Sequence, residues 1–218
     1  MRSATKKIFA AMAILILLLS ATLTGCKDLG GSSQPSESDI KGEWTDGVYA
    51  NKFLNLKFTL PEGWNAASDE EILEIMNLGS ELLDDKDNMI QEMLKQKQIY
   101  NMMAADPTTG VNVSVVMENL ALTVGGTSYD AQEYADFTAE QLEAIEELNY
   151  TASDSKEVEL AGETYVQLPM SVEISGISME QAYYLRKLDK YMVCIIVTDT
   201  AGVGIDTLSA YFEAYSAQ

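Results

Sequence analysis

Polar and apolar residues alternate along several short stretches of this chain, with the period of two that predicts a β-strand. The clearest stretch runs from 54 to 60, and a second runs from 111 to 120, so each is expected to bury one face. The other strands that the pattern predicts cover 48–50, 99–105, 164–174, 181–188 and 191–198. Turns at 106–110 and 188–190 are short enough to join neighbouring strands as hairpins.

Other stretches repeat their apolar residues at the spacing of one helix face. The clearest runs from 129 to 148, after a capping signal at 125–128. Its buried stripe is predicted to consist of Tyr134, Thr138, Leu142 and Ile145. Ser68 stands three residues before Glu71, which is the spacing of a capping box and predicts a helix that continues through Ile72.

Two further helical patterns complete the expected elements. A short one covers 89–94, and a final helix is predicted from the spacing of Leu208, Tyr211, Phe212 and Tyr215. Strands that pair through short turns, interrupted by amphipathic helices, are typical of an antiparallel α+β protein and not of repeated βαβ units. We therefore expect an antiparallel sheet with helices packed on it.

The chain begins with a segment that has the features of a signal peptide. Arg2, Lys6 and Lys7 precede a continuous apolar run over 8–21. This run is shorter than the roughly 20 residues that a membrane-spanning helix needs, but it suits the core of a signal peptide. We therefore predict that residues 1–25 are removed from the mature protein.

Leu23-Thr24-Gly25-Cys26 follows this run and resembles the bacterial lipobox. The resemblance implies cleavage before Cys26 and lipid on its sulfur, which would hold the protein on the extracytoplasmic face of the cell membrane. Two acyl chains on one residue give stable anchoring, whereas one chain binds reversibly. An ordinary signal peptide with an incidental cysteine and an uncleaved anchor are the alternatives.

Composition divides the rest of the chain into two parts. Residues 26–46 are rich in Gly, Ser and polar side chains, which predicts a flexible tether with a reach of roughly 25 Å. Residues 47–218 form the predicted globular domain, and the 193 residues after the leader are enough for one domain with a core.

The charge of the mature chain excludes several partners. The leader holds three of the 14 basic residues and none of the 34 acidic ones, which leaves 11 basic residues and a formal charge of −23. Such a charge repels nucleic acid and anionic lipid head groups, so neither DNA, RNA nor a polybasic membrane contact is expected. The acidic surface is interpreted mainly as a solubility feature, although it is also compatible with cations or basic partners.

Several catalytic chemistries lack their residues in this sequence. The chain has no histidine, which excludes serine and cysteine nucleophiles that depend on one, and any imidazole metal site. Cys194 lies within an apolar run and is expected to be a core thiol, so no intrachain disulfide is predicted. Neither a P-loop nor a dinucleotide-binding fingerprint occurs. We therefore predict no catalytic residue, cofactor or metal site.

Three weaker signals are interpreted as structural. The acidic stretch 84–88 departs from the EF-hand pattern, which favours a solvated junction over a calcium loop. Four methionines are interpreted as core-filling residues, with a soft binding surface as the alternative: Met89, Met93, Met102 and Met103. Trp64 is expected in the core, and Trp44, near the tether, is expected to be partly exposed.

The strand pair around Tyr49-Ala50-Asn51 and 56–64 resembles the start of PsbP-like domains, and 183–215 is similar to their closing hairpin and helix. The stretch 100–110 resembles uncharacterised lipoproteins of anaerobic Gram-positive bacteria. Together the resemblances cover most of 47–218. They imply a helix–sheet–helix sandwich and carry no active-site residue.

Two functions remain as hypotheses. PsbP-like domains act mostly as binding or assembly-assisting modules, which implies a non-catalytic accessory lipoprotein with a protein or small-molecule partner. The alternative is a hydrolase that uses paired carboxylates on envelope or dietary polysaccharide. A deep cleft with two facing acids is expected only for the hydrolase.

Overall fold

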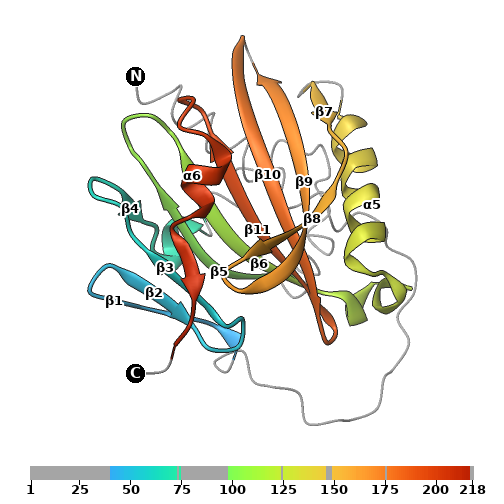
Figure 1. The fold of residues 1–218 in the computed structure, drawn as a ribbon, viewed down its shortest axis with the longest axis horizontal. Helices are drawn as coiled ribbons and strands as arrows, with labels where there is room; N and C mark the ends of the chain where they lie inside the picture. Colours follow the sequence, from blue (N-terminus) through green and yellow to red (C-terminus); the bar gives the residue numbers. More distant parts are fainter. Residues whose placement is uncertain are drawn as a thin grey trace.

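The computed structural model describes residues 40–72, 74, 98–123, 125–145, 149–174 and 176–216, and Figure 1 traces the chain. The predicted leader, the lipobox with Cys26, the stretch 84–88 and the helical pattern over 89–94 lie outside the described residues. No helix within the described ranges is long and apolar enough to cross a membrane.

The centre of the described structure is a large antiparallel sheet (Figure 1). Its strands follow one another in the order β4-β5-β6-β11-β10-β9-β7, and β8 also pairs with β9. The strands are β4 (Asn65–Ala66), β5 (Gln98–Ala105), β6 (Asn112–Asn119), β7 (Tyr150–Ala152), β8 (Lys156–Leu160), β9 (Glu163–Ile174), β10 (Ile177–Leu188) and β11 (Tyr191–Asp199).

A smaller antiparallel sheet packs on one face of the large one. Its order is β1-β2-β3-β12, with β1 (Glu43–Thr45), β2 (Val48–Asn51), β3 (Leu56–Thr59) and β12 (Phe212–Ala214). Helix α6 (Ile205–Ser209) lies against β10 and β11, and α5 (Ala131–Glu143) lies against β7, β9 and β10. Short 3-10 turns, η1 (Leu120–Leu122) and η2 (Gly126–Ser128), lead into α5.

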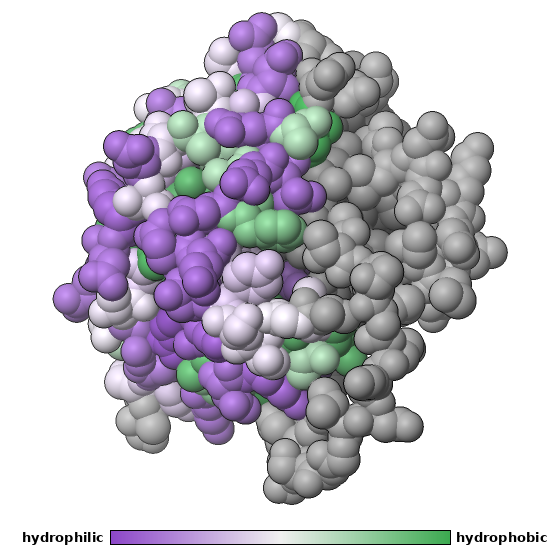
Figure 2. All heavy atoms as spheres, turned by 90° about the vertical axis from the view of Figure 1, so that its right-hand side faces the viewer, coloured by the Kyte–Doolittle hydropathy of each residue, from purple (hydrophilic) through white to green (hydrophobic). Residues whose placement is uncertain are grey.

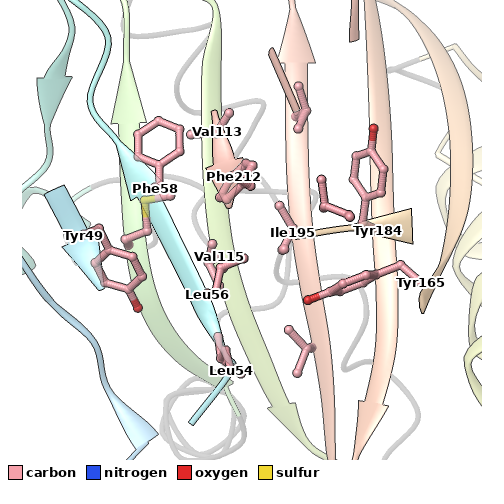
Figure 3. Packing of buried hydrophobic residues seen from close by; sticks show 14 of the residues in the cluster. Tyr49, Leu54, Leu56, Phe58, Val113, Val115, Tyr165, Tyr184, Ile195 and Phe212 are labelled. Carbon is pink, nitrogen blue, oxygen red and sulfur yellow. The ribbon is translucent and has the colours of Figure 1, made fainter. Parts of the chain in front are cut away.

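Each face of the large sheet carries a buried core of its own. On β11, Cys194 and Ile196 belong to the core beneath α5, whereas Val193 and Ile195 belong to the core between the sheets. Figure 3 shows the second core, in which Phe58 of β3 lies above the strands of the large sheet. A strand buried on both sides is a nearly continuous apolar run, as the sequence of β11 is.

The antiparallel α+β class and most of the predicted strands are confirmed. The predicted hairpins at 106–110 and 188–190 are also present, because β5 pairs with β6 and β10 pairs with β11. Strand β6 departs from the prediction of one buried face. Its polar residues Ser114 and Glu118 are each only 4% exposed, because the second face of the sheet is covered too.

The long helix is present but begins and ends inside the predicted range. The N-cap of α5 is Asp130, whose side chain accepts a hydrogen bond from the Glu133 N–H, and the Glu133 side chain accepts one from the Asp130 N–H. This reciprocal capping box, and not the segment 125–128, starts the helix. Tyr134, Thr138 and Leu142 form its buried stripe, as predicted, whereas Ile145 lies beyond the end of the helix and is half-buried.

The predicted C-terminal helix is largely wrong. Helix α6 ends at Ser209, and Phe212–Ala214 continue as β12, which pairs with β3. Phe212 is 4% exposed, and its ring centroid lies 4.9 Å from that of Phe58. Pairing with β3 satisfies backbone groups that a longer helix would leave at an open sheet edge, and it buries Phe212 as well.

Besides β12, four short strands were not predicted, namely β1, β4, β7 and β8. Three of them, β1, β4 and β7, are sheet edges of only two or three residues, too short for a period of two to stand out. Packed structure also starts before residue 47, because Ile40 is 2% exposed and β1 lies at Glu43–Thr45. The last residues of the predicted tether are therefore part of the packed structure.

Candidate functional site

A hollow of about 960 Å³ opens at the end of the large sheet where the β9–β10 hairpin projects, at the top of Figure 1. It is lined by residues of β7, β9 and β10, by the end of β11 and by the loop that leads to α6. The lining residues are Asn149, Thr151, Ser171, Val172, Glu173, Ser178, Met179, Glu180, Asp199, Thr200, Gly202 and Gly204. Nearly all of them are polar or glycine.

Strand register places four of these residues in one row. Thr151 is opposite Ser171, Ser171 is opposite Glu180, and Glu180 is opposite Asp199. Residues directly opposite in antiparallel strands point to the same side of the sheet. The row therefore crosses four strands on the face that carries the smaller sheet elsewhere.

A second row lies further toward the hairpin tip. Glu173 is opposite Ser178, and the Asn149 side-chain amide donates to the Glu173 carbonyl oxygen at 3.5 Å. We call the two rows together the polar face: Asn149, Thr151, Ser171, Glu173, Ser178, Glu180 and Asp199. All of these side chains except Asp199 are exposed.

Asp199 is the buried member of the polar face, with 5% exposure. Its Oδ1 accepts hydrogen bonds from the backbone N–H groups of Ala201 and Gly202, both at 2.9 Å, and its Oδ2 accepts one from Gly204 at 2.7 Å. Burial alone raises the pKa of this carboxyl, but the backbone donors outweigh it and hold the pKa below its usual value of 3.8. Asp199 is therefore ionised at neutral pH, and both of its oxygens are occupied.

The loop that binds Asp199 needs its glycines. Gly202 and Gly204 have φ angles of 73° and 98°, in the region that favours glycine. These conformations turn consecutive N–H groups toward one carboxylate. The sequence predicted a loop here, which is confirmed, but not that it closes one end of the hollow.

Within the part of the chain that the structure describes, the negative charges of the polar face have no basic counterpart. No Lys or Arg is among the residues that line the hollow, and no described basic side chain pairs with Glu173 or Glu180. Glu180 and Asp199 are directly opposite, and like charges in such positions destabilise a sheet. No described Lys or Arg side chain neutralises this pair.

A buried cluster of polar groups lies beneath α5. The Tyr134 hydroxyl donates to Glu118 Oε2, and the Thr123 hydroxyl donates to Oε1 at 3.3 Å. Burial raises the pKa of Tyr134 well above its usual value, and the nearby Glu118 raises it further. Because Glu118 and Tyr134 are both almost fully buried, these groups satisfy one another inside the core and are not open to a substrate.

A second buried network attaches the start of the domain to the large sheet. Asn101 Oδ1 accepts hydrogen bonds from the Gly42 N–H at 3.3 Å, the Tyr49 hydroxyl at 3.2 Å and the Asn51 amide at 2.9 Å. Burial raises the pKa of Tyr49 to about 12. A Cβ at Gly42 would lie 2.4 Å from the Tyr49 ring, so the close approach requires glycine. The role of this network is structural.

The residues singled out in the sequence have the following positions. Cys194 is a buried free thiol whose pKa is raised by burial, as expected of a core residue. Met102 and Met103 are buried in opposite cores, which confirms the core interpretation for these two, whereas Met89 and Met93 lie outside the described residues.

The tryptophans agree with the prediction in part. Trp44 is half-buried, as expected, but Trp64 is also half-buried and packs against the core between the sheets without lying inside it.

In the described ranges, no group of three or more Asp, Glu, Cys or His residues could hold a metal ion.

Comparisons with known proteins give structural likeness only. No family model matches the chain, and no curated protein matches it. A cyanobacterial PsbP (CyanoP) from Synechocystis sp. PCC 6803 is similar, with 12% identity and a TM-score of 0.47 over 88% of this chain and 99% of that one. A protein from Bacteroides thetaiotaomicron has 11% identity and a TM-score of 0.41 over 78% of this chain and 48% of that one. The fold class stated above depends on the strand pairing and not on these likenesses.

Proposed function

We propose that the protein is a lipoprotein anchored through Cys26 on the extracytoplasmic face of the cell membrane, where its domain acts as a non-catalytic binding or assembly-accessory module. The domain is proposed to be PsbP-like in the finer sense, a sandwich with helices on the sheet. The anchor is supported by Leu23-Thr24-Gly25-Cys26 after an apolar leader. The binding role is supported by the polar face.

The observation that carries the binding role is the state of Asp199. General acid–base catalysis by carboxylates needs one group that keeps a proton near neutral pH. Asp199 has a lowered pKa and gives both oxygens to backbone donors, so it shapes the hollow and does not transfer protons. The remaining lining offers exposed hydroxyls, amides and carboxylates, which are groups that bind a partner by hydrogen bonds and charge.

The anchor is tested by partitioning of the expressed precursor between detergent and aqueous phases. Cys26→Ala is expected to move the protein into the aqueous phase, because two acyl chains are lost. Cys194→Ala is the matched control, since it removes the other cysteine from inside the core. If the Cys26 variant partitions like the wild type, lipid on this residue does not hold the protein.

The hydrolase remains the second candidate, because Glu173 and Glu180 lie on neighbouring strands in the same hollow. Diagonal backbone positions of this kind lie about 7–8 Å apart, and side chains from such positions can bring their carboxyls to the roughly 6.5–9.5 Å separation of inverting glycosidases. Release of reducing ends from a polysaccharide panel separates the two proposals. Hydrolysis that disappears in both Glu173→Gln and Glu180→Gln would establish the enzyme and refute the binding module.

A further inference from the structure

We propose that the polar face binds a basic segment of a partner protein in extended conformation, with alternate Lys or Arg side chains on Glu173 and Glu180. This inference rests on the proposed function, because it names the class of partner that the same face holds. It is carried by an open sheet face, by the charge of that face and by the spacing of its carboxylates.

The first observation is that no described element covers the large sheet at this end. Elsewhere the same face is buried beneath the smaller sheet and α6, as Figure 3 shows for Ile195 and Tyr184. Beyond that cover, Thr151, Ser171 and Glu180 stand exposed in one row across neighbouring strands. The hollow of about 960 Å³ lies over this row, which is enough for several side chains of a partner.

The second observation is charge complementarity. Among the described residues, the lining of the hollow includes three carboxylates and no Lys or Arg, within a chain whose formal charge is −20. Glu180 is opposite Asp199 in the strand register, and like charges in such positions repel each other. A cationic partner relieves this repulsion, whereas an anionic ligand adds to it.

The third observation is spacing. Glu180 is opposite Ser171, so Glu173, two residues further along β9, is its diagonal neighbour at about 7–8 Å. Alternate side chains of an extended peptide point the same way and repeat every 6.6–6.8 Å or so. Two basic residues separated by one other residue therefore match the two glutamates. Hydroxyls of Ser171 and Ser178 lie beside them for the backbone of the peptide.

Other occupants fit less well. A metal ion is disfavoured because three backbone N–H groups already bind the Asp199 carboxylate and no suitable group of acids exists among the described residues. Val203, which stands between two lining glycines in the sequence, is 47% exposed and offers an apolar contact that a bare ion would not use. A polypeptide can use the charge, the hydroxyls and such an apolar contact together.

The test uses the mature full-length protein in neutral detergent and fluorescent peptides of about ten residues, long enough in extended form to cross the hollow. One peptide alternates Lys with Ser, and the other alternates Glu with Ser. Fluorescence anisotropy is expected to show binding of the Lys peptide alone. The double variant Glu173→Gln/Glu180→Gln is expected to weaken this binding about tenfold, in line with two exposed charge pairs.

The matched control is Glu140→Gln/Glu157→Gln, which removes the same charge from the opposite side of the large sheet. Glu140 is an exposed residue of α5, and Glu157 is opposite Val166, whose side chain lies in the core beneath α5. Binding by this variant is expected to stay within about twofold of wild type, because an exposed charge on the other side acts weakly. Circular dichroism confirms that both variants are folded.

Equal weakening in both double variants would overturn the inference, because it would mean general attraction to an acidic protein. Absence of Lys-peptide binding by the wild type at low salt would overturn it as well. Neither result touches the proposed function, which fails on its own tests: unchanged partitioning of the Cys26→Ala variant, or hydrolysis that depends on Glu173 and Glu180.

Discussion

At the scale of single residues, Asp199 holds in place the loop that borders the polar face. Asp199 is the last residue of β11, and its carboxylate accepts hydrogen bonds from backbone N–H groups of the following loop. These hydrogen bonds fix the loop beside the hollow. Hydrogen bonds to a charged group each contribute about 1.5–3 kcal/mol, roughly twice the value of neutral ones. A buried carboxylate with several such bonds is therefore a strong structural element.

The substitution Asp199→Asn is expected to lower the free energy of unfolding by about 1.5–3 kcal/mol at pH 7, because one oxygen acceptor becomes an amide donor that faces backbone donors. Denaturant unfolding measures this cost. Asp154→Asn, at an exposed acid for which no described hydrogen bond or ion pair exists, is expected to cost little.

The same substitution has an expected pH dependence. The pKa of Asp199 is lower in the folded protein than its usual value of 3.8, so its stabilisation is fully present above that value. It is lost as the pH falls through the lower, folded pKa. The difference in stability between wild type and Asp199→Asn should therefore shrink below about pH 4. A difference that stays constant down to pH 2–3 or so would contradict this role of the charge.

At the scale of elements, β12 shows how helical spacing misleads. The intervals between Leu208, Tyr211, Phe212 and Tyr215 fit one face of a helix. The backbone nevertheless leaves the helix after Ser209, because β3 offers an edge with which Phe212–Ala214 pair. Lys57 and Glu213 form an ion pair of 2.5 Å across this pairing.

The observed strand β12 and the predicted C-terminal helix lead to different expected results for substitutions at Tyr211 and Phe212. In the strand, Phe212 is buried against Phe58 and Tyr211 is 36% exposed, so Phe212→Ala is expected to cost about 3–5 kcal/mol. Tyr211→Ala should cost clearly less, because its ring touches Phe58 and Trp64 only at 6.3 and 6.4 Å between centroids. Thermal and denaturant unfolding measure the loss of stability in both variants. Similar losses in the two variants would support the predicted helix over the strand.

The sequence predicted the elements that have a complete apolar pattern and missed what depends on pairing between distant segments. Strand β11 was identified because seven apolar residues in succession allow few other structures. The polar face was not identified, since Thr151, Ser171, Glu180 and Asp199 come from four strands and only register aligns them. A period of two places each residue on a face but says nothing about its neighbour across the sheet.

At the scale of the whole molecule, negative charge dominates the surface. The formal charge is −20, and the side seen in Figure 2, over α5 and β7, is mostly hydrophilic where it is described. Charge far from zero keeps a protein soluble but opposes its compact state through self-repulsion. The described ion pairs, such as Lys57–Glu213 and Lys41–Asp69, involve partly exposed groups and contribute little in return.

Salt is therefore expected to stabilise this protein. Raising the ionic strength from about 0.01 to about 0.15 M shortens the Debye length from about 30 to about 8 Å, which screens repulsion between distant acids more than it weakens close ion pairs. Thermal unfolding in rising NaCl should show an increasing Tm, and Glu173→Gln/Glu180→Gln should show a smaller increase because two repelling charges are absent. Sucrose at matched osmolality gives the control, since it favours burial without screening charge and should not distinguish the variant from the wild type. A Tm that falls with NaCl would mean that close ion pairs outweigh the repulsion between acids. The proposed basic partner would then have no repulsion to relieve on the polar face.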